Sequence, residues 1–268
     1  MKDDMGKSAG TSSVQRRTLF KPGSWITNID FINHLILFNK VLITVLADKE
    51  GGKSSFCTLL HNNLDKQIKP VAMNLTPSCT TEHIISHIAT QLHVEQEQDK
   101  PLDIHSIAAV INERKEHVLV IIDDAQYLNE AFIKESMVVI KNQVDSGFFH
   151  LCFVADNALV DVLNPLAVDQ FNNLVHTMEL GLLSESETRT YVLQRALAAN
   201  LITLPLPDVY FKQFYQMTKG GLAKINTEME AFILNCKPEK KGTNNGLLLK
   251  KTSIALSTLL VIGCAYLY

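Results

Sequence analysis

Apolar residues follow two patterns along this chain, short unbroken runs and helical spacings of three and four. Unbroken runs bounded by turn residues are typical of strands that are buried on both faces. Residues 118–122 form such a run, and 41–46 is apolar except for one threonine. The stretches 70–75, 149–155 and 174–180 are more mixed, and we predict strands there as well. Helical spacing occupies the stretches 27–39, 53–65, 80–94, 102–113 and 130–144. Strands that alternate with helices predict an α/β fold with a parallel sheet and helices on both of its faces.

Three more helical segments follow the last predicted strand, and no strand separates them. They occupy residues 183–200, 207–218 and 222–234. A run of helices after an α/β pattern predicts a separate small layer. We therefore expect an α/β domain at residues 19–181 and a helical lid at residues 182–236.

The first predicted strand leads into a phosphate-binding loop, in the segment VLITVLADKEGGKSSFCTLL at residues 41–60. Gly51 and Gly52 allow the backbone to approach a polyphosphate closely, with successive N–H groups turned toward it. Lys53 can reach the β- and γ-phosphates, and the Ser54 hydroxyl can bind Mg²⁺. The helix that begins near Lys53 adds its positive N-terminal end, which includes Ser55. The segment predicts a P-loop of the Walker A type.

One position of this loop departs from the pattern. Ala47 stands where the motif has its first glycine. Alanine fits there if its φ is negative and is strained if φ is positive. Without further support, a Gly-Gly-Lys-Ser run is also compatible with an ordinary surface turn.

A second motif supports the nucleotide interpretation. Residues 117–126 read HVLVIIDDAQ, a buried strand that ends in two carboxylates. In a Walker B motif, Asp123 would hold Mg²⁺ directly or through water, and Asp124 would polarise the attacking water. The alternative is that these carboxylates only cap the following helix. Together with the P-loop, they predict a site for ATP and Mg²⁺.

Three segments resemble the AAA+ P-loop ATPases of the ExeA secretion type, the transposition-target type and the DamX-like type. They are DDAQYL at 123–128, SESETRTYVLQRAL at 184–197 and GGLAKINTE at 220–228. The resemblance implies ATP hydrolysis, self-assembly into a homo-oligomer, and an unknown partner protein of the cell envelope, of secretion or of division. It also implies one membrane helix after the ATPase domain, here without the SPOR domain of DamX-like proteins.

Several positions depart from that resemblance. The lid residue that senses nucleotide corresponds to Lys224, which lacks the planar fork of arginine. After the strand 149–155, Asp156 or Asn157 would orient the water, and Asn157 is the better donor. No Lys or Arg lies between Lys141 and Arg189, where an arginine finger is expected. We therefore expect nucleotide binding with slow hydrolysis, and the alternative is a non-hydrolysing interaction module.

Both ends of the chain differ from the middle. Residues 1–18 are polar, lack a signal peptide and are expected to be disordered. Residues 237–251 form a basic polar linker, and residues 252–268 carry no charge. At about 1.5 Å per residue the last segment would reach about 25 Å as a helix, and lysines on its near side could snorkel. We expect a single-pass anchor in the lipid of a bacterial inner membrane, with the ATPase domain cytoplasmic. The alternative is a core helix.

The net charge and the cysteines narrow the remaining function classes. A net charge of −3 gives no overall attraction to nucleic acid, so a DNA-dependent ATPase is the least favoured class. The five cysteines show no metal-binding spacing, and they are interpreted as small apolar fillers in a reducing compartment.

Overall fold

The computed structural model describes residues 19–95, 101–169, 171–202 and 206–236. Contacts divide the chain after Cys236, so all described residues belong to one compact unit. The predicted tail at 1–18, the linker at 237–251 and the membrane anchor at 252–268 lie outside the described residues. Within the described ranges, no helix combines the length and the hydropathy needed to cross a membrane.

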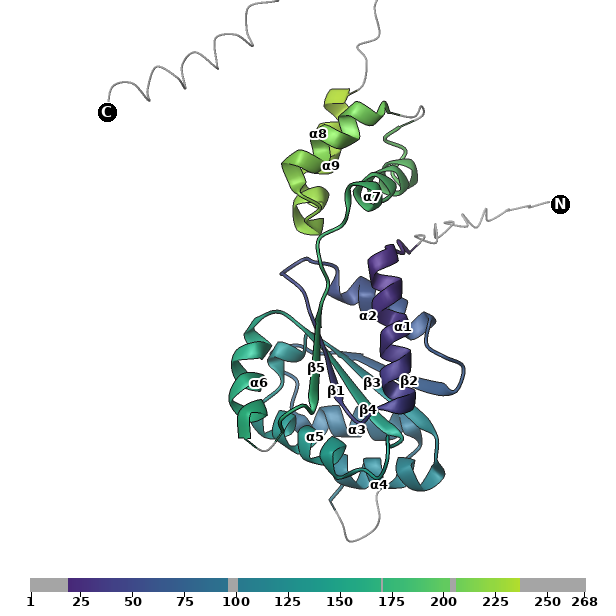
Figure 1. Cartoon of the computed structure of the whole chain (residues 1–268), viewed down its shortest axis with the longest axis vertical. Coiled ribbons are helices and arrows are strands. Elements are labelled where there is room, and N and C mark those ends of the chain that lie inside the picture. Colours follow the sequence, from purple (N-terminus) through teal and green to yellow (C-terminus); the bar gives the residue numbers. More distant parts are fainter. Residues whose placement is uncertain (1–18, 96–100, 170, 203–205, 237–268) are drawn as a thin grey trace, which may run out of the picture. The chain divides into compact units, whose positions relative to one another are not determined.

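Five parallel strands form the centre of the α/β part, in the spatial order β2-β3-β4-β1-β5 (Figure 1). Their bounds are β1 (Leu42–Leu46), β2 (Ile68–Asn74), β3 (His117–Asp123), β4 (Phe149–Ala155) and β5 (Val175–Glu179). The register places Leu46 beside Ala155, and Asp123 beside both Val154 and Asn74. The carboxyl ends of β1, β3 and β4 therefore meet at one edge, where ligands bind in open α/β sheets. The predicted parallel sheet is confirmed.

Helices cover both faces of this sheet. The helices of the α/β part are α1 (Gly23–Phe38), α2 (Lys53–Asn62), α3 (Thr81–Leu92), α4 (Ile104–Arg114), α5 (Glu130–Asn142) and α6 (Ala158–Asp169). One hydrophobic cluster joins α3, α4, α5 and α6 to one face, and a second joins α1 and α2 to the other. Strand β3 shows the division, because Val120 belongs to the first cluster and Leu119 to the second.

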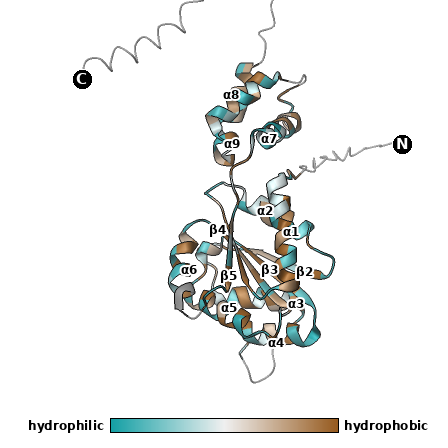
Figure 2. Ribbon diagram, viewed as in Figure 1, coloured by the Kyte–Doolittle hydropathy of each residue, from teal (hydrophilic) through white to brown (hydrophobic). Residues whose placement is uncertain are grey.

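The central strands are mostly apolar because both of their faces are covered. Every residue of β1 and β4 is buried, including the polar Thr44 and His150. Figure 2 colours these central strands largely as hydrophobic. This double burial explains why apolar runs located β1, β3 and β4, whereas β2 and β5 are only partly buried.

Two helices differ from the prediction. Helix α6 has no counterpart among the predicted elements, because Pro165 lies inside it and an internal proline removes a backbone donor. Helix α1 begins at Gly23, four positions before the predicted start, with Pro22 as its N-cap residue. Its first turn thereby includes Trp25, which is buried.

Three helices follow β5, close to the bounds that the sequence predicted: α7 (Glu185–Ala198), α8 (Asp208–Thr218) and α9 (Leu222–Cys236). These three helices are called the lid here, and they belong to the same compact unit as the sheet. Helix α7 begins with a capping box, in which the Ser184 hydroxyl accepts the Glu187 N–H at 3.2 Å and the Glu187 carboxylate accepts the Ser184 N–H at 2.9 Å. Glu187 also accepts hydrogen bonds from the backbone N–H and the hydroxyl of Ser24, both at 3.3 Å. Its carboxylate therefore links the start of α7 to the start of α1.

Candidate functional site

The loop between β1 and α2 presents unpaired backbone donors. Gly52 is the N-cap residue of α2, has a φ of +95° and provides no side-chain cap. Within the described part of the chain, the N–H groups of Lys53, Ser54 and Ser55 have no hydrogen-bond partner. Unpaired N–H groups at a helix N-terminus form a binding site for anions such as phosphate.

Ala47 fits its position in this loop. Its φ is not positive, and its N–H donates to the carbonyl of Ala155 at 3.0 Å. The Ala47 methyl group therefore causes no backbone strain, which a positive φ would have produced. Gly51 is more constrained, because a Cβ there would lie 2.8 Å from the Asp48 carbonyl oxygen.

Gly52 is enclosed by two apolar side chains from distant segments. A Cβ at this position would lie 2.6 Å from Cη2 of Trp25 and 2.9 Å from Cδ1 of Leu222. Trp25 belongs to α1 and Leu222 begins the lid helix α9. The phosphate loop is therefore in direct contact with both the N-terminal helix and the lid.

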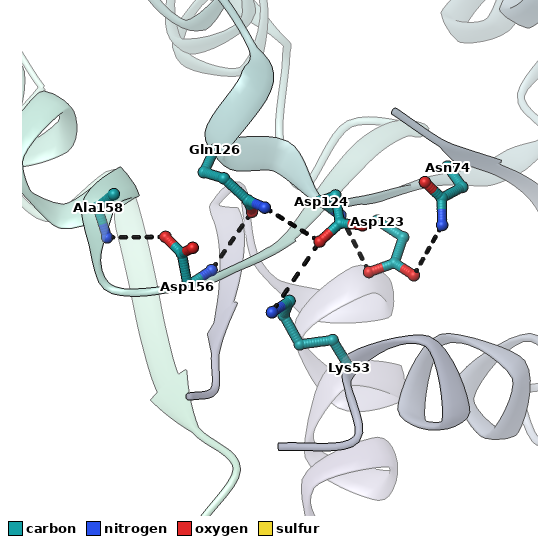
Figure 3. Close-up of polar contacts among 7 residues, drawn as sticks. All are labelled: Lys53, Asn74, Asp123, Asp124, Gln126, Asp156 and Ala158. Atoms are coloured by element: carbon teal, nitrogen blue, oxygen red, sulfur yellow. Dashed lines mark hydrogen bonds and ion pairs between the residues drawn. The ribbon is translucent and has the colours of Figure 1, made fainter. Parts of the chain in front are cut away.

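The P-loop lysine faces the second carboxylate of the Walker B segment. Nζ of Lys53 lies 3.9 Å from Oδ1 of Asp124 (Figure 3). The same oxygen accepts a hydrogen bond from Nε2 of Gln126 at 3.0 Å. Asp124 adopts a left-handed φ of +55° directly after β3, which directs the chain into the short 3₁₀ turn η1 (Ala125–Tyr127). These contacts bring together the two motifs that the sequence predicted.

The first carboxylate lies deeper. Asp123 is 5% exposed, and it accepts hydrogen bonds from the Asp124 N–H at 3.0 Å and from Nδ2 of Asn74 at 3.5 Å. Burial, followed by the neighbouring Asp123 carboxylate, raises the pKa of the Cys57 thiol. Cys57 is therefore a neutral thiol beside this carboxylate. Two hydrogen bonds thus fix Asp123 beneath the loop.

Gln126 extends the network to the end of β4. Its Oε1 accepts the backbone N–H of Asp156 at 3.4 Å, and the Asp156 carboxylate caps the N–H of Ala158 at 3.0 Å (Figure 3). Of the two predicted water-orienting residues, Asp156 lines the central cavity. Asn157 is exposed and does not belong to that lining, so the structure does not bring the preferred candidate into the site.

A cavity of about 840 Å³ opens over this network. Its polar end is lined by Gly52, Lys53, Ser54, Ser55, Asp124, Gln126 and Asp156. Its apolar lining comes from Leu19, Phe20, Trp25, Tyr191 and Leu222. Phe20 and Tyr191 meet edge to face, with ring centroids 5.0 Å apart. The volume lies in the range of small-molecule and cofactor sites, and the combination of a polar and an apolar part suits a nucleotide.

The lid contributes residues other than the predicted one. Lys224 is exposed and does not line the cavity, whereas Gln194, Arg195 and Asn226 do. Tyr191 and Arg195 occur in the lid segment whose resemblance was noted, but their role depends on tertiary packing. Trp25 carries no sequence signal beyond being an apolar residue near a helix start.

The comparisons with known proteins agree with this geometry. Residues 36–163 match the model of the AAA domain family. The Aeropyrum pernix ORC2 protein, solved in ADPNP–ADP complexes, is 13% identical with a TM-score of 0.54, and the match covers 78% of this chain and 60% of that one. The structure of Drosophila ORC bound to DNA is 11% identical with a TM-score of 0.54, and the match covers 76% of this chain and 59% of that one.

A third similar structure is the signal-transduction ATPase with a tetratricopeptide repeat sensor, PH0952 from Pyrococcus horikoshii. It is 11% identical with a TM-score of 0.50, and the match covers 86% of this chain and 31% of that one. A comparison with curated proteins finds no match. This chain spans about 60% of the length of the ORC chains. At these identities the likeness establishes the fold, which is that of AAA+ P-loop ATPases.

Proposed function

We propose that this chain binds Mg-ATP and hydrolyses it slowly, as an AAA+-type ATPase. The observation that carries the proposal is the meeting of Lys53 and Asp124 at 3.9 Å in the floor of the cavity. An ordinary surface turn at the Gly-Gly-Lys-Ser run, or carboxylates that only cap a helix, would give no reason for these two side chains to lie together. Their juxtaposition beside unpaired N–H donors is the arrangement that phosphoryl transfer requires.

Each residue has a defined task in this proposal. The N–H groups of Lys53, Ser54 and Ser55 bind phosphate oxygens, and the Lys53 ammonium balances the charge of the β- and γ-phosphates. The Ser54 hydroxyl binds Mg²⁺, which neutralises developing charge when it is bound. Asp123 is buried, so its contact with the ion would pass through water. Asp124 orients the attacking water once Lys53 turns from it to the phosphates.

A direct test compares nucleotide binding and phosphate release in four forms of the full-length chain. They are the wild type, Lys53→Ala, Asp124→Asn and, as a matched surface control, Lys66→Ala. We expect Lys53→Ala to lose binding, Asp124→Asn to bind but release phosphate at least tenfold more slowly, and Lys66→Ala to resemble the wild type. Equal phosphate release from all four proteins would refute the proposal.

A non-hydrolysing nucleotide-binding module is the second candidate. The specific observation in its favour is that Oδ1 of Asp124 is already engaged by Lys53 and Gln126. Aspartate is also one methylene shorter than the glutamate usual at this position, and no Lys or Arg lies between Lys141 and Arg189 to serve as an arginine finger. Tight Mg-ATP binding without turnover at any protein concentration would support this candidate. Turnover that rises with assembly would refute it.

The membrane and partner parts of the proposal rest on the sequence. Residues 252–268 carry no charge and follow Lys250 and Lys251, which supports a single-pass anchor in a bacterial inner membrane with the ATPase domain in the cytoplasm. An envelope, secretion or division protein would be the partner on that membrane. Extraction of the full-length chain from membranes by carbonate, at the same yield as a soluble protein, would refute the anchor.

Nucleic acid is not part of the proposal. Drosophila ORC is bound to DNA in its structure, but the similarity at 11% identity concerns the fold. The net charge of −3 provides no general attraction to a phosphate backbone. DNA binding that weakens steeply with added salt would contradict this part.

A further inference from the structure

The three arginines in the described ranges have very different partners. Arg114 donates two hydrogen bonds to the carbonyls that end α3, at 2.9 and 3.0 Å. Arg189 forms an ion pair with Asp208 at 2.7 Å. The guanidinium group of Arg195 has no ion pair or hydrogen bond with any described residue. Arg195 is therefore the described arginine whose N–H donors remain available to a ligand.

The surroundings of Arg195 hold its guanidinium group without using those donors. Its Cζ lies over the ring of Tyr191, 5.3 Å from the ring centroid. The Tyr191 ring is itself fixed, because its hydroxyl donates to Oδ1 of Asn226 at 2.7 Å and the ring packs against Phe20 in an edge-to-face contact. Stacking occupies the flat face of a guanidinium and leaves its N–H groups pointing outward in the plane.

Arg195 also lies on the side of α7 that faces the cavity. Glu187, Tyr191 and Arg195 follow one another at intervals of four residues, which places them on one face of the helix. Tyr191 and Arg195 line the same cavity as Lys53. Arg189 lies in the same helix but lines a different hollow, together with Asp208. Position on the helix therefore separates the two arginines.

The charges around the cavity lack a partner for this guanidinium. The basic side chains of the lining are Lys49, Lys53 and Arg195, and the acidic ones are Glu50, Asp124 and Asp156. Asp124 is engaged by Lys53 and Gln126, Asp156 caps the start of α6, and Glu50 forms no ion pair with Arg195. The anion that suits a stacked, unpaired guanidinium in this cavity is the polyphosphate of the ligand.

We propose that Arg195 binds the phosphate tail of a nucleoside triphosphate from the lid of the same subunit, taking the role that the sequence suggested for Lys224. This inference rests on the proposed nucleotide site. A triphosphate would join the P-loop to α7 through Arg195, and loss of the terminal phosphate would weaken that link. The lid would thereby distinguish triphosphate from diphosphate without a lysine or arginine on α9.

The test measures how tightly ATP, ADP and adenosine bind to the full-length chain in the presence of Mg²⁺. Trp25 is the only tryptophan and lines the cavity, so its fluorescence can report binding, and calorimetry provides an independent value. We expect Arg195→Ala to weaken ATP binding by about tenfold to a hundredfold, the usual effect of losing a hydrogen bond to a charged group. The affinity for ADP should fall less, and the affinity for adenosine should not change.

Two further variants control this result. Arg195→Lys should restore part of the ATP affinity, because lysine keeps the charge but loses the planar fork. Arg189→Ala removes an arginine from the same helix outside the cavity and should leave all three affinities unchanged. Equal weakening for ATP, ADP and adenosine would overturn the inference and assign Arg195 to base stacking, and so would an unchanged ATP affinity. Failure of the wild type to bind any nucleotide would instead overturn the proposed function.

Discussion

Substitution of Gly52 by alanine is a sharp test of the geometry of the phosphate loop. The residue has a φ of +95°, and a non-glycine residue in the left-handed region costs about 1–2 kcal/mol. The new Cβ would also lie 2.6 Å from the Trp25 indole and 2.9 Å from Leu222. Overpacking of this kind costs about 1–3 kcal/mol, because one of the two helices must shift. We expect the free energy of unfolding to fall by about 3 kcal/mol in total.

The assay is thermal unfolding followed by circular dichroism, with nucleotide binding as a second readout. For a domain of this size, a loss of about 3 kcal/mol lowers the melting temperature by about 6–12 °C. Gly181→Ala is the matched control, since nothing lies within 4 Å of a Cβ there and its φ is not in the left-handed region. We expect the control to melt like the wild type.

A double variant separates steric crowding from backbone strain. Leu222→Ala in the background of Gly52→Ala removes one of the two crowding side chains, so the second substitution should cost less than it does in the wild type. An unchanged melting temperature for Gly52→Ala would refute the contact between loop, indole and lid. Strictly additive losses in the double variant would refute the steric part.

Three further predictions concern titration, thiol reactivity and the carboxylate network. Burial, with a smaller contribution from His117, lowers the pKa of His150 from 6.5 to about 4. As the pH falls, the unfolded chain therefore protonates this histidine before the folded chain does, so the free energy of unfolding should fall by about 3 kcal/mol between pH 6.5 and pH 4. His150→Gln should flatten this pH dependence in denaturant titrations. Iodoacetamide should label Cys79 before Cys57 and Cys152, and mass spectrometry can follow the order. Hydrogen bonds with Thr76 lower the pKa of Cys79, whereas burial raises the pKa of the other two thiols. Simultaneous labelling of all three would contradict this. Gln126→Ala should lower phosphate release several-fold with ATP affinity unchanged, since only the positioning of Asp124 is lost; a matched loss of affinity would contradict it.

The strands were predictable because of how they are buried. Residues 118–122 and 149–155 are buried on both faces and are apolar except for His150, and no local signal competes with that pattern. Helix α6 was missed because Pro165 weakens its helical signal, while tertiary packing of Leu159 and Leu163 stabilises it. Strands that are buried on both faces could be located from the local sequence, whereas helix α6 depends on tertiary packing that the local sequence does not show.

The same distinction separates the parts of the site. Gly52, Lys53, Ser54 and the Asp123-Asp124 pair lie within short motifs whose spacing follows from the backbone geometry of a loop or a strand end. Lid residues approach the loop only through packing, so their positions cannot be read from spacing. The exposure of Lys224 and the inward position of Arg195 depend on which face of each helix meets the core.

The contacts of Gly52 link nucleotide binding to the rest of the described unit. Trp25 and Leu222 touch the loop directly, and Glu187 joins the start of α7 to the start of α1. Phosphates that bind the loop N–H groups therefore act on a point that α1 and α9 share, and an arginine on α7 would add a third connection. If ATP binds as proposed, we expect its binding to alter the position of the lid even when hydrolysis is slow, because the loop, α1 and α9 share these contacts.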